Sequence, residues 1–207
     1  MNARAIASIG TGSHQPLLRL AARSFRPFAQ RHGYDLHLHT EVVDASRPVS
    51  WSKVPILRGL LERYEMVLWL DSDLVIVDPR EDIPCPDFMG IVEHETREGR
   101  MPNAGVLALR SGDRARAFLD AIWAQEDLIE HKWWENAAIC RLLGYTLDPV
   151  GPGAQTRWLR HTTFLDPRWN AIPDAPVRGA RIRHYPGYSV KTRAALMTRD
   201  LLLRRRR

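Results

Sequence analysis

The sequence predicts an α/β fold in which helices flank a central sheet that is mostly parallel or mixed. Short apolar runs alternate with segments of helical period, an order typical of proteins with a largely parallel sheet. The run 66–70 is apolar throughout, as expected of a central strand covered on both faces. With 207 residues the chain can form a sizeable core. We therefore expect one domain over residues 1–207 that ends in a basic tail at 204–207.

The first half of the chain predicts two strand–helix units and then the central strand. Apolar residues recur at helical spacing after the glycines at 10 and 12, and again after Ser50–Ser52. The stretches between them are short, apolar and bounded by turn residues. The expected strands are 5–10, 36–40 and 66–70, and the expected helices cover 17–29 and the segment from 53 to 64.

The second half predicts one more central strand and three helices. The strand is 105–110, which follows Asn103-Ala104-Gly105. A clear amphipathic stripe predicts a helix over 113–123, and two further helices are expected at 134–143 and 190–203. The region 149–176 is rich in Pro, Gly and Trp without a clean period, so loops and short strands are expected there.

Charge and cysteine content limit the possible partners. The net charge is +6, and almost all of the basic residues are arginines, which suit phosphate and carboxylate partners. Since the only dense basic run is Arg204–Arg207, we expect no nucleic-acid partner. This run is either a solvated tail or a peripheral contact with anionic lipid. Cys85 and Cys140 fit neither a zinc site nor a disulfide framework, which favours a reducing compartment.

Targeting signals are not evident in the sequence. The apolar run near the N-terminus is too short for a signal peptide, and no stretch approaches the roughly 18 apolar residues of a membrane span. We therefore expect a cytoplasmic protein, with peripheral contact at the inner face of the membrane as the alternative.

Two carboxylates interrupt the most apolar segment of the chain, at Asp71-Ser72-Asp73. In an extended chain, side chains two residues apart point the same way, so these two would converge at the carboxyl end of a central strand. Open α/β sheets bind ligands at that end. Paired carboxylates repel unless a proton or a cation lies between them, and oxygen ligands suit Mg²⁺ or Mn²⁺. The alternative is that both acids end a turn at the surface.

Several segments occur in the order SWSKVPILRGLL, YEMVLWLDSDLVIVD, NAGVLALR, WWENAAI, FLDPRWNAI and RHYPG. Taken together in this order, they resemble glycosyltransferases of the GT-A fold that carry a DxD motif. The resemblance is nearest to the galactosyl/xylosyltransferase family and extends to the bacterial lipopolysaccharide galactosyltransferase group. It implies a single GT-A (Rossmann-like) domain, a UDP-sugar donor, and Mn²⁺ or Mg²⁺.

The resemblance also implies which residues hold the metal and the donor. Asp71, Asp73 and His184 would be the metal ligands, and Asp71 would also touch the donor. The remaining donor contacts it implies are Thr11, Gly12, Lys53, Asn103, Gly105, Gly187 and Lys191. Each also has an ordinary structural explanation, such as a strand-to-helix turn or a solvated lysine at the start of a helix. Lys191 departs from the bacterial spacing, and Arg193 is a second source of positive charge there.

Glu135 and Asn136 occupy the position of an acidic-Gln pair near the reacting sugar carbon in related enzymes. They are therefore the implied catalytic residues, although Asn is one methylene shorter than Gln. The structural alternative for Glu135 is an acid favoured by the helix dipole. The related families retain anomeric configuration, and since no nucleophile is evident we hypothesise front-face transfer.

The implied reaction moves a hexose or pentose from a UDP-sugar to a glycan, a lipid-linked acceptor or another hydroxyl. Two alternatives stay open. The chain could be a non-catalytic module that binds nucleotide sugars or glycans. It could also be an Asp-x-Asp phosphohydrolase, although such enzymes place the acid pair nearer the N-terminus than this chain does.

Overall fold

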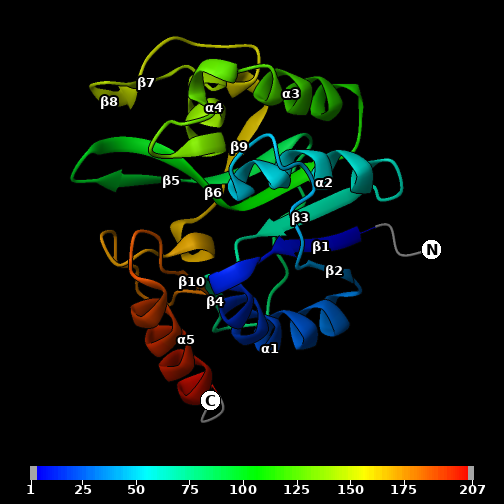
Figure 1. Ribbon diagram of the computed structural model, residues 1–207, viewed down its shortest axis with the longest axis vertical. Helices are drawn as coiled ribbons and strands as arrows, with labels where there is room; N and C mark the ends of the chain where they lie inside the picture. Colours follow the sequence, from blue (N-terminus) through cyan, green and yellow to red (C-terminus); the bar gives the residue numbers. More distant parts are fainter. Residues whose placement is uncertain (1–3, 205–207) are drawn as a thin grey trace.

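The computed structural model describes residues 4–204, in which five α-helices cover both faces of a mixed sheet (Figure 1). The helices are α1 (Gln15–His32), α2 (Lys53–Leu61), α3 (Asp113–Trp123), α4 (Trp134–Leu142) and α5 (Val190–Arg204). The strands are β1 (Arg4–Ile9), β2 (Asp35–His39), β3 (Met66–Leu70), β4 (Leu74–Ile76), β5 (Met89–Thr96), β6 (Gly99–Arg110), β7 (Tyr145–Leu147), β8 (Val150–Pro152), β9 (Thr162–Phe164) and β10 (Ile182–His184).

The main sheet of the described residues has eight strands, six of which follow the order β2-β1-β3-β6-β5-β9, with β7 and β8 off this path. Strand β1 pairs in parallel with both β2 and β3, whereas β6 runs antiparallel to β3 and β5. A second sheet joins β4 and β10 in antiparallel register. The predicted α/β class with a mostly parallel or mixed sheet is confirmed.

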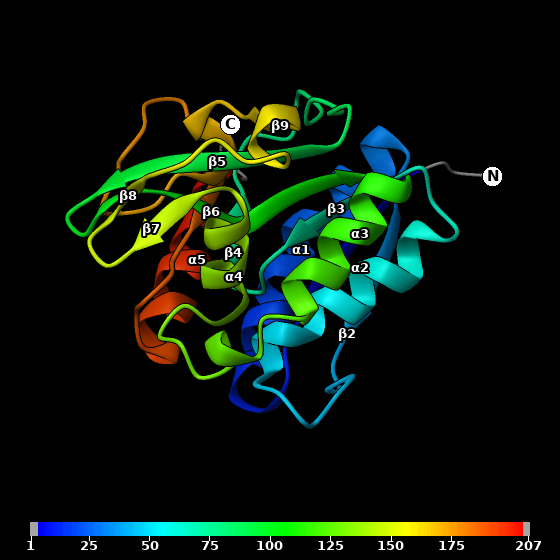
Figure 2. The same ribbon diagram turned by 90° about the horizontal axis from the view of Figure 1, so that it is seen from above.

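Two hydrophobic layers follow from the alternation of side chains along the strands. On β3, Val67 and Trp69 pack in the layer beneath α2, α3 and α4, while Met66, Leu68 and Leu70 pack in the layer against α1. Figure 1 shows α1 and α5 on one side of the sheet, and Figure 2 shows α2, α3 and α4 over the other. Because both faces are covered, β3 is buried along its whole length.

The structure bears out the predicted helices and the first three strands to within a few residues at their ends. The strand predicted at 105–110 is the second half of the longer β6, which begins at Gly99. Strand β5 was not predicted, because Glu93, His94 and Glu95 break its apolar pattern. Its partner β6 follows after a tight turn, and the pairing of the two strands overrides the local signal. The expected short strands within 149–176 are present as β8 and β9.

The last helix, α5, ends at Arg204, so residues 205–207 of the predicted basic tail lie outside the described residues. None of the helices within residues 4–204 combines the length and the apolar character needed to cross a bilayer.

Candidate functional site

The turn Asp71-Ser72-Asp73 connects β3 to β4 and lies beside β10. The extended backbone assumed from the sequence is therefore wrong here, yet the carboxylates still converge. Strand β10 brings in His184 by pairing with β4, where His184 lies opposite Leu74. Asp71, Asp73 and His184 each offer a ligand atom, and these atoms lie within 4.8 Å of one another.

Asp71 is held so that one of its oxygens is anchored and the other faces this cluster. Its backbone N–H donates to the carbonyl of Gly105 at 2.9 Å. Its Oδ1 accepts from Trp69 Nε1 at 2.6 Å and lies 3.4 Å from Lys53 Nζ. Its Oδ2 lies 3.9 Å from His184 Nε2. A carboxylate fixed in this way presents Oδ2 without further reorganisation.

His184 is oriented by a buried amide that the sequence reasoning missed. The side-chain Oδ1 of Asn170 lies 3.0 Å from His184 Nδ1, and Asn170 Nδ2 donates to Asn103 Oδ1 at 3.0 Å. Since Nδ2 of Asn170 donates to Asn103, its Oδ1 is the atom that accepts from Nδ1 of the imidazole. His184 Nε2 is then the ring atom that faces Asp71 and Asp73. The only sequence signal for Asn170 was its place in the FLDPRWNAI segment.

The donor set fits a divalent cation. His184 Nε2 lies 3.3 Å from Asp73 Oδ1, and a lone pair that faces two carboxylates is repulsive unless a proton or cation lies between them. Two carboxylate oxygens and one imidazole nitrogen suit a divalent metal ion such as Mn²⁺, and an imidazole that binds a metal usually donates its other N–H to an oxygen, as His184 does to Asn170.

Arg193 places a positive charge beside this cluster. Its Nη1 lies 3.1 Å from Asp73 Oδ2 and 3.3 Å from His14 Nε2. Burial opposes the charge of Asp73, but His184 and then Arg193 lower its pKa to about 2. Lys191 is exposed and forms no hydrogen bond or ion pair with the described part of the chain, so Arg193 is the basic residue that the fold brings here.

A buried ion pair lies behind Asp71. Lys53 and Glu135 are 3% and 5% exposed, and Lys53 Nζ donates to Glu135 Oε1 at 2.6 Å and to the carbonyl of Ala104 at 3.0 Å. The alternative of a solvated lysine is therefore wrong. Burial lowers the pKa of Lys53, but the carboxylates of Asp71 and Glu135 outweigh this effect and raise it above its usual value. Burial raises the pKa of Glu135.

Asn136 uses its side chain to join α4 to β6. Its Oδ1 accepts from the backbone N–H of Ala104 at 2.8 Å, and its Nδ2 donates to the carbonyl of Pro102 at 3.2 Å. These contacts place Asn136 next to Glu135 and Lys53, although its own polar atoms are already bonded.

The chain is similar to known proteins in part of its sequence and in its fold. Residues 10–86 match the galactosyl transferase GMA12/MNN10 family. The rice protein described as probable glycosyltransferase 5 (Oryza sativa subsp. indica) is 34% identical over 76 residues, which are 35% of this chain and 16% of the rice protein. The chain thus spans only a small part of the curated relatives that it matches.

Solved structures match over nearly the whole chain. A glycosyltransferase involved in glycosylation of the major capsid of PBCV-1 has a TM-score of 0.67 at 20% identity, covering 94% of this chain and 99% of the other. The galactosyltransferase LgtC, solved with donor and acceptor sugar analogs, has a TM-score of 0.61 at 14% identity, covering 96% and 95%. The chain has the GT-A glycosyltransferase fold. The resemblance inferred from the motifs is confirmed for the fold.

Within this GT-A fold, Gly105 lets His184 approach β6. A Cβ added at Gly105 would lie 2.3 Å from Cε1 and 2.7 Å from Nδ1 of His184. Because the ring is buried and hydrogen-bonded to Asn170, it cannot move aside freely. We expect Gly105→Ala to weaken Mn²⁺ binding at the cluster about 10- to 100-fold, because changes to the residues that orient a metal ligand typically have effects of this size. Calorimetry with Mn²⁺ measures this affinity.

Gly59 provides the matched control for this substitution. It lies inside α2, and a Cβ there would meet nothing within 4 Å. We expect Gly59→Ala to leave Mn²⁺ affinity unchanged and to stabilise the fold by about 1 kcal/mol. Equal Mn²⁺ affinity in the Gly105→Ala protein and its parent would contradict the role given to Gly105.

Thr11 and Gly12 lie in the turn after β1, and Gly187 lies in the turn after β10, the strand that carries His184. Thr11 precedes the short 3-10 helix Gly12–His14, and Gly12 and Gly187 have φ angles of 51° and 78°. Backbone with positive φ favours glycine. A Cβ at either glycine would meet nothing within 4 Å, so the space above them is open. Gly187 also lines a cavity of about 190 Å³. Their contact with a donor stays a prediction.

His94 on β5 is a buried histidine that is expected to lower the stability of the fold in acid. It is 3% exposed, and its Nε2 has no hydrogen-bond partner within the described residues. Burial, and then the nearby His184, lower its pKa from 6.5 to about 4. The unfolded chain therefore binds this proton below pH 6.5 while the folded chain does not, and stability falls between pH 6.5 and 4.

We expect His94→Leu to remove about 3 kcal/mol of the loss in unfolding free energy between pH 7 and pH 4. Urea unfolding at both pH values measures this difference. Replacement of the exposed His161 by Gln is the control and should leave the pH dependence unchanged. An identical acid loss in the His94→Leu protein and the parent would count against this assignment.

Proposed function

We propose that this chain is a metal-dependent glycosyltransferase that moves a hexose or pentose from a UDP-sugar to a glycan or another hydroxyl acceptor. The observation that carries the proposal is the convergence of Asp71, Asp73 and the Asn170-oriented His184 within 4.8 Å, on a GT-A fold. We propose UDP-galactose, UDP-glucose and UDP-xylose, in that order of preference, as the donors.

Asp71, Asp73 and His184 would hold Mn²⁺ or Mg²⁺. When bound, such an ion neutralises charge on the diphosphate and favours departure of the nucleotide. Arg193, 3.1 Å from Asp73, adds positive charge at the same place, and Lys191 is a further candidate for diphosphate contact. We propose that Thr11, Gly12, Asn103, Gly105 and Gly187 surround the donor.

Lys53 and Glu135 form the inner wall of the proposed site. Lys53 Nζ lies between Glu135 Oε1 and Asp71 Oδ1, at 2.6 and 3.4 Å. Since Glu135 is bonded to Lys53 and nearly fully buried, we propose that it supports the donor site and does not attack the sugar. Transfer would then occur on the front face with retention, and a glycosyl adduct trapped on Glu135 would contradict this.

The acceptor is proposed to be a glycan or a lipid-linked sugar, and the protein to act in the cytoplasm. A peripheral contact through Arg204–Arg207 is part of this proposal, although 205–207 lie outside the described residues. Vesicle sedimentation without salt-dependent binding would remove that contact from the proposal and leave the transferase assignment intact.

The test is a thermal shift panel with UDP and the three UDP-sugars, each with and without Mn²⁺. A ligand at 100 times its Kd stabilises by about 2.7 kcal/mol, which corresponds to a Tm increase of roughly 5–10 °C for a chain of this size. We expect the increase only when the metal is present. Sugar transfer and donor hydrolysis assays with Mn²⁺ follow for the donor that shifts Tm most.

A non-catalytic module that binds nucleotide sugars is the second candidate. It is favoured by Asn136, whose polar atoms bond to Ala104 and Pro102 and are not left free to face a sugar. Metal-dependent binding without transfer or hydrolysis would favour this module. Indifference of UDP binding to Mn²⁺ and Mg²⁺ would argue against both candidates.

A further inference from the structure

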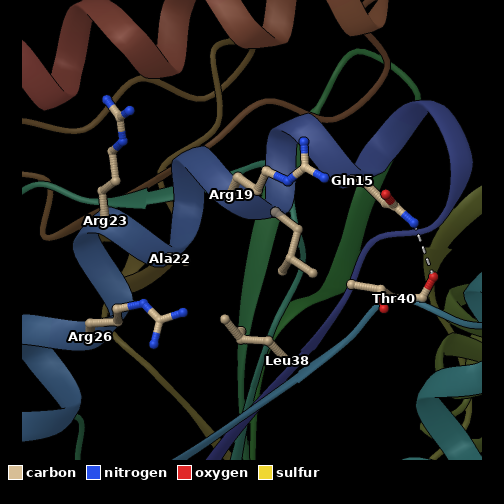
Figure 3. A pocket seen from close by; sticks show the side chains of 8 residues that line it. Gln15, Arg19, Ala22, Arg23, Arg26, Leu38 and Thr40 are labelled. Carbon is tan, nitrogen blue, oxygen red and sulfur yellow. Dashed lines mark hydrogen bonds between the residues drawn. The ribbon is translucent and has the colours of Figure 1, made fainter.

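A groove outside the Asp71 cluster runs between α1 and the edge strand β2 (Figure 3). Its volume is about 340 Å³, within the range of small-molecule sites. Its lining residues are Gln15, Leu18, Arg19, Ala22, Arg23, Arg26, Leu38 and Thr40. The proposed sugar transfer uses none of these residues.

Three arginines form a stripe along this groove. Arg19, Arg23 and Arg26 are spaced by four and three residues, so they share one face of α1. Figure 3 shows the three side chains leaving α1 in different directions, with Arg26 on the side of Leu38 and Arg23 pointing away from it. All three are exposed, and within residues 4–204 their guanidinium groups form no ion pair or hydrogen bond.

Helix α1 offers these arginines no partner of opposite charge, because Gln15–His32 contains no acidic residue. Like charges at this spacing repel on a helix. An anion that binds two or three of the guanidinium groups would remove this repulsion. Arginine binds phosphate through two parallel N–H···O bonds, which makes a phosphate group the fitting anion.

The floor of the groove is apolar. Leu18 and Ala22 are buried in the helix face, and Leu38 on β2 lies opposite them. One end is closed by a hydrogen bond from Gln15 Nε2 to the carbonyl of Thr40, at 3.4 Å. A ligand that matches both parts carries a phosphate for the arginines and an apolar portion for the floor.

We propose that the groove between α1 and β2 binds a phosphate monoester that carries an apolar group, with the phosphate on Arg19, Arg23 and Arg26 and the apolar group on Leu18, Ala22 and Leu38. A lipid headgroup and a soluble organic phosphate share this chemistry. The site is separate from the Asp71 cluster and does not depend on sugar transfer.

The experiment compares monomeric dihexanoyl phosphatidic acid with dihexanoyl phosphatidylcholine by calorimetry. We expect at least tenfold tighter binding of phosphatidic acid to the parent protein. The Arg19→Gln/Arg23→Gln double variant should lose this preference, and Arg97→Gln/Arg178→Gln, which removes equal charge from exposed arginines elsewhere, should keep it. Loss of the preference in both double variants, or in neither, would overturn the proposal.

Two more measurements identify the source of the phosphate and separate this site from the donor site. Competition by hexyl phosphate assigns a soluble ligand, whereas Arg19- and Arg23-dependent binding to vesicles with 20% phosphatidic acid, without such competition, assigns a lipid headgroup. Either result supports the site. The Tm of the double variant and its Tm shift with UDP and Mn²⁺ should equal those of the parent, since both arginines are exposed. A changed UDP shift would overturn the separation from the donor site.

Discussion

Replacing both Asp71 and Asp73 with Asn is expected to lower kcat/KM for sugar transfer by at least about 1,000-fold, because removal of a single charge-stabilising group already costs 100- to 1,000-fold in comparable sites. Asn keeps an oxygen for Trp69 and Lys53, which hold Asp71 Oδ1, so the local structure should survive. Calorimetry of UDP with and without Mn²⁺ provides a second measurement. The parent should bind UDP more tightly with the metal, and the variant should show no difference.

The matched control removes two exposed acids elsewhere, Glu41→Gln and Asp87→Asn. This variant should retain both transfer and metal-dependent UDP binding. If the Asp71→Asn/Asp73→Asn protein bound UDP as tightly as the parent and with the same dependence on Mn²⁺, the transferase assignment would be lost.

The second large effect concerns the stability of the fold. Lys53→Met should lower the free energy of unfolding by about 3–5 kcal/mol, because Glu135 would be left as an uncompensated buried charge beside Asp71. Urea unfolding measures the loss, provided the m-value is unchanged. The exposed pair Lys132–Glu98 is the comparison, and Lys132→Met should cost less than about 1 kcal/mol.

A variant without both Lys53 and Glu135 distinguishes the cost of an unpaired buried carboxylate from the cost of losing the lysine side chain. A Lys53→Met/Glu135→Leu protein should recover at least about 2 kcal/mol relative to Lys53→Met, since apolar replacement of a whole buried pair is often nearly neutral. Additive losses in the double variant would show that the two side chains act independently. A cost below about 1 kcal/mol for Lys53→Met would contradict the role given to the pair.

The sequence was most informative where residue patterns are local. The apolar run 66–70 and the helical stripes gave the α/β class, and Asp71 and Asp73 stood out because carboxylates are rare beside a buried strand. His184 was predicted as a ligand only because the segment RHYPG resembles a motif of the glycosyltransferase family. Strand β5 was missed because its stability comes from pairing with β6 and packing, which its own sequence does not display.

The connections within the site could not be predicted. Lys53 and Glu135 are 82 residues apart in the sequence, and nothing in their local sequence indicates that α2 and α4 bring them within 2.6 Å. Asn170 was unremarkable as one polar residue in an irregular loop, although it is fully buried and orients His184. The orientation of α5 in the fold brings Arg193, and not Lys191, to Asp73. These are tertiary relations between distant segments.

The pairing of β4 with β10 brings together Asp73 and His184, which are far apart in the sequence. An ion held by both would bind only the folded chain, in which these two segments meet, so its binding free energy would stabilise their contact. Its removal by a chelator should therefore loosen β10 and the start of α5 first, and their amide protons should exchange faster while those of β1 and β3 keep their rates.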